Sequence, residues 1–206
     1  IFNLSEAYDS DRAFEPHMAA LFELMRIPYT GAKVGPLSIC KDKGLAKKIL
    51  SFHKIRVPKF QISMLKNPVK RLGIFPYPAF VKPLGLESSE GITQMSLVNN
   101  EKEAMERIRY IHQKLETDVI IEEYIEGREI YVSVMGNDRI NVFPTRELFF
   151  NQVPEGEPKF ATFKAKWDDI YRKKWGIHTG PAKAFPEGVE EKILSTCKKI
   201  YQILQM

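Results

Sequence analysis

The chain has 206 residues, of which 44% are hydrophobic, 11% aromatic and 28% charged, and this composition predicts a globular protein of one or two domains. No apolar run approaches the roughly 20 residues of a membrane-spanning helix and no signal-peptide pattern occurs, which argues against membrane and secreted classes. The formal net charge is +5, but the basic residues are spread along the chain without an arginine-rich arm, so a small polyanion is as good a partner as nucleic acid.

The cysteines and the two ends of the chain give further expectations. Cys40 and Cys197 form no motif, which predicts a reducing, cytoplasmic setting. The chain begins at Ile1 inside an apolar run and ends at Met206 inside a helical pattern. We therefore expect an internal fragment of a longer protein, in which residues 1–4 are a candidate buried strand of a sheet that lies upstream of this chain.

The first part of the chain predicts two helices and a strand. Residues 12–26 carry apolar side chains at helical spacing, and Pro16, tolerated only in a first turn, places the start of this helix nearby. Residues 27–31 stop the helix, and Asp42 is a candidate N-cap for a second helix over residues 43–53. A strand at residues 60–64 and a loop with Pro and Gly at 66–77 follow.

The central part, residues 78–129, predicts three strands and one helix. The strands are expected at residues 79–82, 92–98 and 119–122, the second as the antiparallel neighbour of the first, and the helix at 104–115 after a capping pair of Asn100 and Glu103. This order predicts an α+β fold with antiparallel sheets rather than alternating βαβ units. The chain has no Walker-type or Rossmann-type glycine motif.

The last part predicts a hairpin, a long polar segment and a helix. Strands are expected at residues 130–135 and 140–143, joined by a turn at 136–138. Residues 151–188 are too long for an ordinary loop, so we expect a functional or mobile segment. The final helix should begin near Glu187.

Lys82 and the loop after it are the first candidates for a ligand site. Lys82 ends an apolar strand, and it either binds phosphate or is a solvated charge, which is the more common case. The loop at residues 85–91 holds two glycines and two serines, whose N–H groups and hydroxyls are suited to covering phosphates. An ordinary hairpin turn has a similar composition.

Carboxylates close the next strand. Glu122 and Glu123 point to opposite faces, so one of them faces inward and needs a partner. The exocyclic amine of adenine would serve, with the main chain of residues 123–125 pairing with the adenine edge. Glu129 could accept hydrogen bonds from ribose, and a phosphate would explain why the cation Lys43 sits in the first turn of a helix. Solvated side chains remain the alternative for each, but their combination predicts an ATP site between two sheets.

With these residues in view, the sequence resembles the ATP-grasp superfamily and, within it, the D-alanine–D-alanine ligase family. The matching residues keep the family order and spacing over most of residues 27–204. They are Ile27-Pro28-Tyr29-Thr30-Gly31, Asp42-Lys43 with Lys47, Val57-Pro58, Val81-Lys82-Pro83, Ser88-Ser89 with Gly91-Ile92, Glu122-Glu123-Tyr124-Ile125, Gly127-Arg128-Glu129, Ala165-Lys166-Trp167 and Pro181-Ala182.

The resemblance implies a role in ATP binding for residues of three segments. Lys43 and Lys82 would contact the phosphates, with Lys82 also near the adenine. Glu122 would accept from the adenine amine, the segment Glu123, Tyr124 and Ile125 would bind the adenine edge through its main chain, and Glu129 would bind ribose.

The resemblance also implies a reaction. ATP and Mg²⁺ would activate a carboxylate as an acyl phosphate, and an amine would attack it to form an amide or peptide bond. Ser88 and Ser89 would lie on a flexible lid, with Ser88 also ordering the reacting groups, and Lys166 would lie near the phosphates and the acyl phosphate. Ser88 and Lys166 are therefore the candidate catalytic residues.

Three departures from the family pattern bear on catalysis. The lid reads Leu86-Glu87-Ser88-Ser89 where the family usually has Glu-Gly-Ser-Ser, and Glu90 adds negative charge near the phosphates. Residues 2–6 lack the family's His-Gly and Gly-Glu-Asp-Gly pattern. No metal ligand is predicted within this chain, because the acidic and Asn residues that hold magnesium in the family would lie downstream of it.

These observations predict the end of an N-terminal α/β domain at residues 1–41, a central lid-bearing domain at 42–126 and an incomplete C-terminal domain at 127–206, with ATP between the last two. The predicted function is that of an ATP-dependent carboxylate–amine ligase, with ATP and a small amino acid or peptide as partners, no nucleic acid or membrane partner, and a homodimer as an open possibility. A ligase for a different amino acid or peptide, or a nucleotide-binding module that has lost catalysis, are the alternatives.

Overall fold

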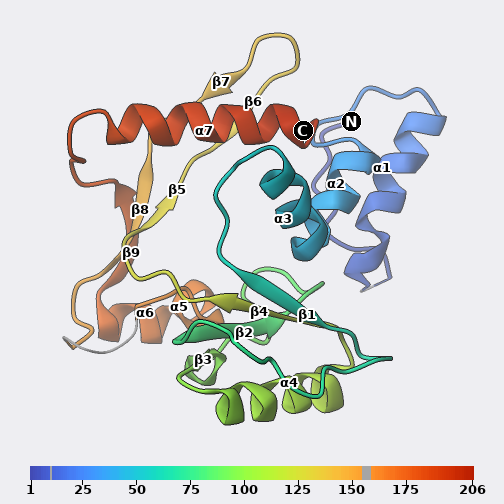
Figure 1. Cartoon of the computed structure of the whole chain (residues 1–206). Coiled ribbons are helices and arrows are strands. Elements are labelled where there is room, and N and C mark those ends of the chain that lie inside the picture. Colours follow the sequence, from blue (N-terminus) through green and yellow to red (C-terminus); the bar gives the residue numbers. More distant parts are fainter. Residues whose placement is uncertain (10, 155–158) are drawn as a thin grey trace.

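The computed structural model describes residues 1–9, 11–154 and 159–206, and it combines helices with short strands (Figure 1). The helices are η1 (Arg12–Phe14), α1 (Glu15–Leu24), α2 (Val34–Lys41), α3 (Lys43–Phe52), η2 (Gln94–Ser96), α4 (Glu101–Leu115), α5 (Phe163–Trp167), α6 (Asp169–Trp175) and α7 (Val189–Ile203). The strands are β1 (Phe60–Ser63), β2 (Ala79–Pro83), β3 (Leu97–Val98), β4 (Val119–Glu123), β5 (Glu129–Tyr131), β6 (Val134–Met135), β7 (Asn141–Val142), β8 (Arg146–Phe150) and β9 (Ile177–Pro181).

The strands pair antiparallel throughout the described residues. They form a four-stranded sheet of order β1-β4-β2-β3, a three-stranded sheet of order β5-β8-β9 and the hairpin β6-β7. The four-stranded sheet lies in the lower part of Figure 1 with α4 beneath it, and α7 crosses the upper part, below the β6–β7 hairpin. The α+β class predicted from the sequence is confirmed. The predicted domain boundaries stay a prediction, and the one at residue 126 falls between β4 and β5.

One face of the four-stranded sheet is buried against α4. Asn100 begins this helix by accepting a hydrogen bond from the backbone N–H of Glu103 (3.0 Å), as expected for an N-cap. Apolar residues of β2, β4 and α4 then meet in a core, in which Val81, Val119, Ile121, Ala104, Ile108 and Ile111 are fully buried.

The other face of the same sheet carries the candidate site. Because successive side chains of a strand point to opposite faces, Phe80 and Lys82 on β2 and Glu122 on β4 lie on the face turned away from α4. Helix α3 packs on this side at close range, since a Cβ added to Gly44 would lie 2.4 Å from Ile62 Cδ1. A larger residue at position 44 would therefore force the Ile62 side chain to move.

Most predicted elements are confirmed. Asp42 caps α3 by accepting from the N–H groups of Gly44 and Leu45 (2.9 Å each). Helix α1 begins one residue before Pro16, as the proline predicted. The further confirmed elements are β1, β2, α4, β4, the β6-β7 hairpin and α7.

Two strand expectations are wrong, and one is untested. Residues 1–4 are not a strand among the described residues, where Ile1 makes backbone hydrogen bonds with Pro28 and Thr30, and their expected pairing with an upstream sheet stays a prediction. The strand expected at 92–98 is limited to Leu97–Val98, since η2 occupies the preceding residues. The strand expected at 130–135 is split into β5 and β6.

The polar segment at residues 151–188 is also more ordered than expected. It contains α5, α6 and β9, whereas residues 155–158 lie outside the described residues. Thr162 and Asp168 cap the two helices by accepting from backbone N–H groups, and β9 pairs with β8 over five residues. Helix α2 and strand β8 were not predicted. No helix among the described residues is both long and apolar enough to cross a membrane.

The core against α4 predicts a strong position dependence of stability. Ile108 is 1% exposed, and Ile108→Ala should lower the free energy of unfolding by about 2–5 kcal/mol because it removes buried methyl groups and leaves a cavity. The matched control is Ile74→Ala, because Ile74 is fully exposed and its truncation should change stability by less than about 0.5 kcal/mol. Urea unfolding measures both, and similar losses in the two variants would contradict this core.

Candidate functional site

A buried carboxylate held between two lysines forms the centre of the candidate site. Glu122 on β4 is 6% exposed, and its Oε2 lies 2.8 Å from Lys82 Nζ on β2. Its Oε1 lies 3.2 Å from Lys47 Nζ on α3. Phe80 on β2 lies directly opposite Glu122 on β4. Lys82, two residues after Phe80, is therefore a diagonal neighbour of Glu122 on the same face and can reach its carboxylate.

The charges around Glu122 keep it ionised. Burial raises the pKa of this carboxyl group, but Lys82 and Lys47 lower it by more, so the pKa lies below its ordinary value. Oε1 is buried and has no hydrogen bond of good geometry despite the nearby Lys47. The carboxylate therefore keeps one oxygen able to accept from a ligand.

A cavity of about 310 Å³ opens beside this carboxylate. Among the residues proposed from the sequence, its lining includes Lys82, Ser89, Glu122, Glu123, Tyr124, Ile125, Glu129 and Lys166. Of the predicted site residues only Lys43 and Ser88 are outside the lining. The structure thus brings together residues that lie up to 84 positions apart in the sequence (Lys82 and Lys166).

Aromatic side chains form one wall of the cavity, and two of them, Phe80 and Phe160, were not among the residues predicted from the sequence. The rings of Phe80 and Phe160 meet edge to face at 4.9 Å, and Tyr124 stacks on Phe80 with centroids 6.4 Å apart. Phe80 could have been found, because it lies two residues before Lys82 and so on the same face. Phe160 and the neighbouring Ala161 carry no such signal, because the polar segment at residues 151–188 has no periodicity that assigns its side chains to a face.

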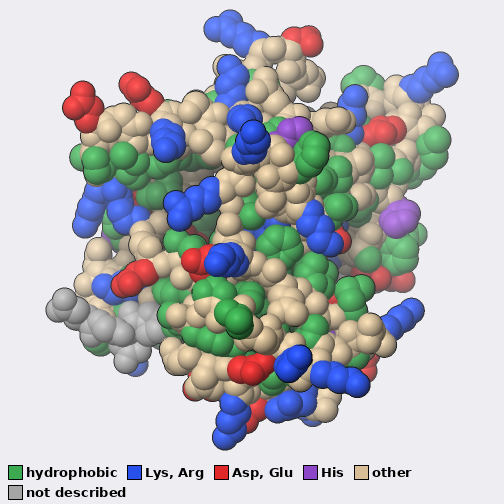
Figure 2. Space-filling view, in the orientation of Figure 1, with side chains coloured by type: hydrophobic (Ala, Val, Ile, Leu, Met, Phe, Trp, Pro, Cys, Tyr) green, Lys and Arg blue, Asp and Glu red, His purple; other side chains and the backbone are tan. Residues whose placement is uncertain are grey.

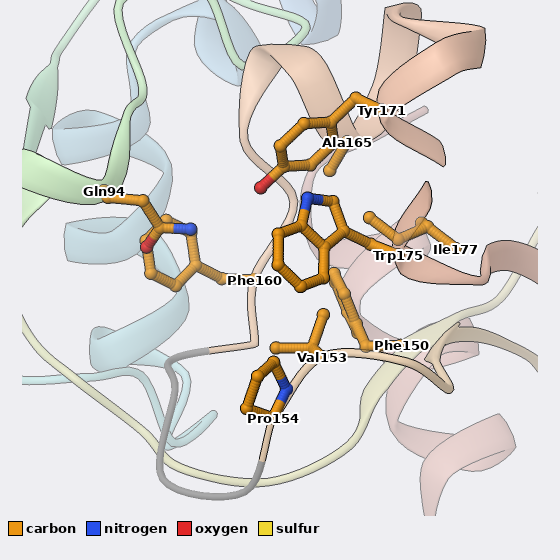
Figure 3. Close-up of a pocket in the computed structure, with 9 residues that line it drawn as sticks. All are labelled: Gln94, Phe150, Val153, Pro154, Phe160, Ala165, Tyr171, Trp175 and Ile177. Carbon is orange, nitrogen blue, oxygen red and sulfur yellow. The ribbon is translucent and has the colours of Figure 1, made fainter. Parts of the chain in front are cut away.

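A second cavity of about 300 Å³ adjoins the first, and Phe160 lines both. Figure 3 shows the Trp175 indole between the rings of Tyr171 and Phe150. Gln94 contributes a polar group to an otherwise mostly apolar lining. Phe150, Tyr171, Trp175 and Ile177 come from β8, α6 and β9, whereas Gln94 comes from η2, so residues of both sides of the chain face this cavity.

Lys43 lies beside the cavity rather than in its lining. Its Nζ donates to the carbonyl oxygens of Leu84 (2.9 Å) and Leu86 (2.5 Å), and it thereby ties α3 to the start of the loop at residues 85–91. Burial first, and then the nearby Lys82, lower the pKa of Lys43 to about 8.

The loop at residues 85–91 closes over the cavity and contacts its far wall. Ser89 Oγ donates to Ala161 O (2.7 Å), and Trp167 Nε1 donates to Ser88 O (3.0 Å). Ser88 and Ser89 have φ of 52° and 66°, a left-handed backbone that costs energy outside glycine. Two hydrogen bonds to one segment, at Ala161 and Trp167, hold this strained turn.

Glu129 is fixed at the opposite rim. Its Oε2 accepts from the Ala161 N–H (3.2 Å), and the Tyr131 hydroxyl donates to its Oε1. Burial, together with that bond, raises the pKa of Tyr131 above its ordinary value. The Tyr131 hydroxyl therefore stays protonated as a donor.

This arrangement fits a ligand that has a flat apolar part, an amine and a negatively charged end. The aromatic wall and Ile125 suit a planar ring, Glu122 suits an amine donor, and Lys82 and Lys166 suit phosphate oxygens. The described residues contain no cluster of three His, Cys, Asp or Glu side chains that could hold a metal ion.

Comparison with known proteins finds one family that covers most of the chain. The family described as D-ala D-ala ligase C-terminus matches residues 39–206. The D-alanine–D-alanine ligase of Thermoanaerobacter sp. is 34% identical over 158 residues, which is 72% of this chain and 40% of that protein. The chain spans about half the length of the curated relatives it matches.

Solved structures show the same fold. The VanG D-Ala:D-Ser ligase of Enterococcus faecalis aligns with a TM-score of 0.67 and 25% identity, covering 93% of this chain and 53% of that one. The D-alanine–D-alanine ligase of Bacillus anthracis complexed with ATP aligns with a TM-score of 0.63 and 20% identity, covering 91% and 54%.

The lowered pKa of Lys43 predicts a pH-dependent stability. Lys43 releases its proton near pH 8 in the folded protein and near its ordinary pKa of 10.5 in the unfolded chain. Between these values the unfolded chain binds more protons, so this group makes folding more favourable as the pH rises from about 8 to about 10. Below about pH 8 the lysine is charged in both the folded and the unfolded state, so it contributes no pH dependence to the free energy of unfolding.

Urea unfolding of the wild type and of Lys43→Met measures this effect. The difference between the two unfolding free energies should shift in favour of the wild type as the pH rises through the window. Lys70→Met, at an exposed position, is the control, and its free energy of unfolding should change with pH in the same way as that of the wild type. A Lys43→Met curve that also runs parallel would contradict the buried, destabilised cation.

Proposed function

The chain belongs to the family described as D-ala D-ala ligase C-terminus, and we propose that it forms the nucleotide-binding part of an ATP-dependent carboxylate–amine ligase. The family and the ATP-grasp fold predicted from the sequence are both confirmed. The reaction, the substrates and the roles of single residues belong to the proposal.

The observation that carries the proposal is that residues from separate elements meet around one cavity. Residues from β2, β4, the loop at 85–91 and α5 meet around one space of about 310 Å³. This lining pairs a buried carboxylate and lysines with an aromatic wall. A core packed only for stability would not gather these charges, because burying them costs free energy.

Adenine would lie against the aromatic wall. Glu122 Oε1 would accept from the exocyclic amine, and the main chain of Glu123 and Ile125 would pair with the ring edge. The N–H groups of Glu123 and Tyr124 donate to Lys59 O (2.8 Å) and Pro78 O (3.1 Å), which holds this stretch in place. Glu129 would accept from the ribose hydroxyls.

The phosphates would lie toward Lys82, Lys43 and Lys166. A proton-bearing lysine offsets the charge of the transferring phosphoryl group, and ATP would supply that group to form an acyl phosphate with the substrate carboxylate. The loop with Ser88 and Ser89 would exclude water that hydrolyses such an intermediate. Ser88 would order the reacting groups, and an amine would complete the amide or peptide bond.

Magnesium is part of the proposal, with no step assigned to residues of this chain. The described residues lack a cluster of acidic or histidine side chains able to bind it. ATP and a small amino acid or peptide are the proposed partners, without nucleic acid or membrane, and a homodimer stays a prediction. The reducing, cytoplasmic setting predicted from the sequence belongs to the proposal as well.

Amine-dependent turnover tests the reaction. The protein at its full natural length, given ATP, magnesium and a panel of amino acids, should release ADP and phosphate only when an acceptable amine is present. A dipeptide formed from D-alanine would identify a D-alanine–D-alanine ligase, and turnover with another amino acid would identify a ligase of different specificity. ATP binding without amine-dependent release would contradict the ligase and support a nucleotide-binding module.

A lysine pair tests the nucleotide site itself. Lys82→Ala should weaken ATP binding by about 10- to 100-fold, because a charge-assisted contact in a buried site is lost. Lys70→Ala, at an exposed position outside the cavity, should bind ATP as the wild type does. Calorimetric titration measures both after circular dichroism has shown that they are folded, and equal binding curves would refute this site.

A further inference from the structure

A third hollow, apart from the two cavities described above, lies between α4 and the segment of η2 and β3. It has a volume of about 540 Å³ and is lined by Thr93, Met95, Leu97, Val98, Glu103, Glu106, Arg107 and Tyr110, and we call it the α4–β3 groove. In Figure 2 hydrophobic side chains gather over the β2–β3 region, with charged side chains below them over α4. This volume is within the range of small-molecule sites.

Arg107 in this groove is a buried cation without an acidic partner. It is 6% exposed, and none of the ion pairs of the described residues includes it. Its Nη2 donates to Gly91 O (2.6 Å) and Ser96 Oγ (3.4 Å), whereas Nε is buried with no hydrogen-bond partner. A buried charge left in this state costs free energy unless an anion completes it.

Other groups of the groove define what else a ligand must carry. Glu103 is engaged at the start of α4, where it accepts from Asn99 N (2.8 Å) and Asn100 Nδ2 (2.7 Å). Glu106 is exposed and lies one position before Arg107. A simple anion would be repelled by Glu106, whereas a ligand that also carries an ammonium group would be attracted by it.

The apolar part of the groove is large and open. Met95 is 73% exposed and Tyr110 49%, and the Arg107 guanidinium lies 5.0 Å from the centre of the Tyr110 ring. These side chains with Leu97 would cover an apolar side chain of a ligand.

We propose that the α4–β3 groove binds a free amino acid with an apolar side chain. Its carboxylate would pair with Arg107, its ammonium group with Glu106, and its side chain with Met95 and Tyr110. The site is separate from the nucleotide cavity, although the two share one segment, since Ile92 lines the cavity and Thr93 lines the groove. Arg107 also holds Gly91 O at the end of the loop that covers the cavity.

Phenylalanine is the probe for this site, read out by NMR of the protein with ¹³C-labelled methionine methyl groups. The Met95 signal, assigned with Met95→Leu, should shift with saturation and a Kd on the order of 1 mM, as expected for about 12 non-hydrogen atoms. 2-Phenylethylamine lacks the carboxylate and 3-phenylpropionate lacks the ammonium group, so each should bind at least about tenfold more weakly.

Two exposed positions of α4 make the test independent of folding. Glu106→Lys should weaken phenylalanine binding about tenfold and should strengthen binding of 3-phenylpropionate. Arg109→Gln is the matched control, because Arg109 is exposed and outside the lining, and it should leave both affinities unchanged. Lys82→Ala should also leave them unchanged, which separates this site from the nucleotide site and from the proposed reaction.

Two results would overturn the proposal. One is a Met95 signal that does not move with either enantiomer of phenylalanine up to about 20 mM, far above the expected Kd. The other is equal binding of phenylalanine and 2-phenylethylamine, since a carboxylate would then play no part.

Discussion

The arrangement of the site depends on one buried carboxylate with two cations. Glu122 can be buried at the end of β4 only because Lys82 and Lys47 reach it from β2 and α3, at 2.8 and 3.2 Å. Removing one partner of such a group leaves a charge in a poorly solvated place, which costs about 3–5 kcal/mol in buried pairs. The same requirement therefore fixes α3 against the sheet and leaves a charged, partly unsatisfied oxygen at the edge of a cavity.

The parts of the fold that local rules control could be predicted from the sequence. Asp42 and Asn100 cap helices through their own side chains, and the strand alternation places Lys82 and Glu122 on one face. Phe160 reaches the cavity through tertiary packing of a polar segment, which has no periodicity to read. The strand expected at 92–98 is wrong for its first part, because Thr93 and Ser96 each bond the other's backbone N–H through their side chains and so stabilise the 3-10 helix η2. Such local hydrogen bonds compete with strand pairing.

The loop at residues 85–91 shows how the departures from the family pattern are accommodated. Glu87 turns toward Lys41 (3.5 Å), which also pairs with Glu15 (2.7 Å), so its charge is engaged outside the cavity lining. Glu90 is exposed. The added negative charges of this loop are therefore offset by a lysine or by solvent, and they do not enter the lining of the proposed nucleotide site.

Gly91 forms the tight turn between the nucleotide cavity and the α4–β3 groove. Its φ is +71°, and an added Cβ would lie 2.8 Å from both Pro83 Cγ and Leu115 Cδ1, so a larger residue here would be strained and would have to displace these side chains. That turn presents the Gly91 carbonyl to Arg107 and sends Ile92 and Thr93 into different hollows. The backbone between the cavity and the α4–β3 groove is thus a single tight turn, held on one side by Ser89 and on the other by a buried guanidinium.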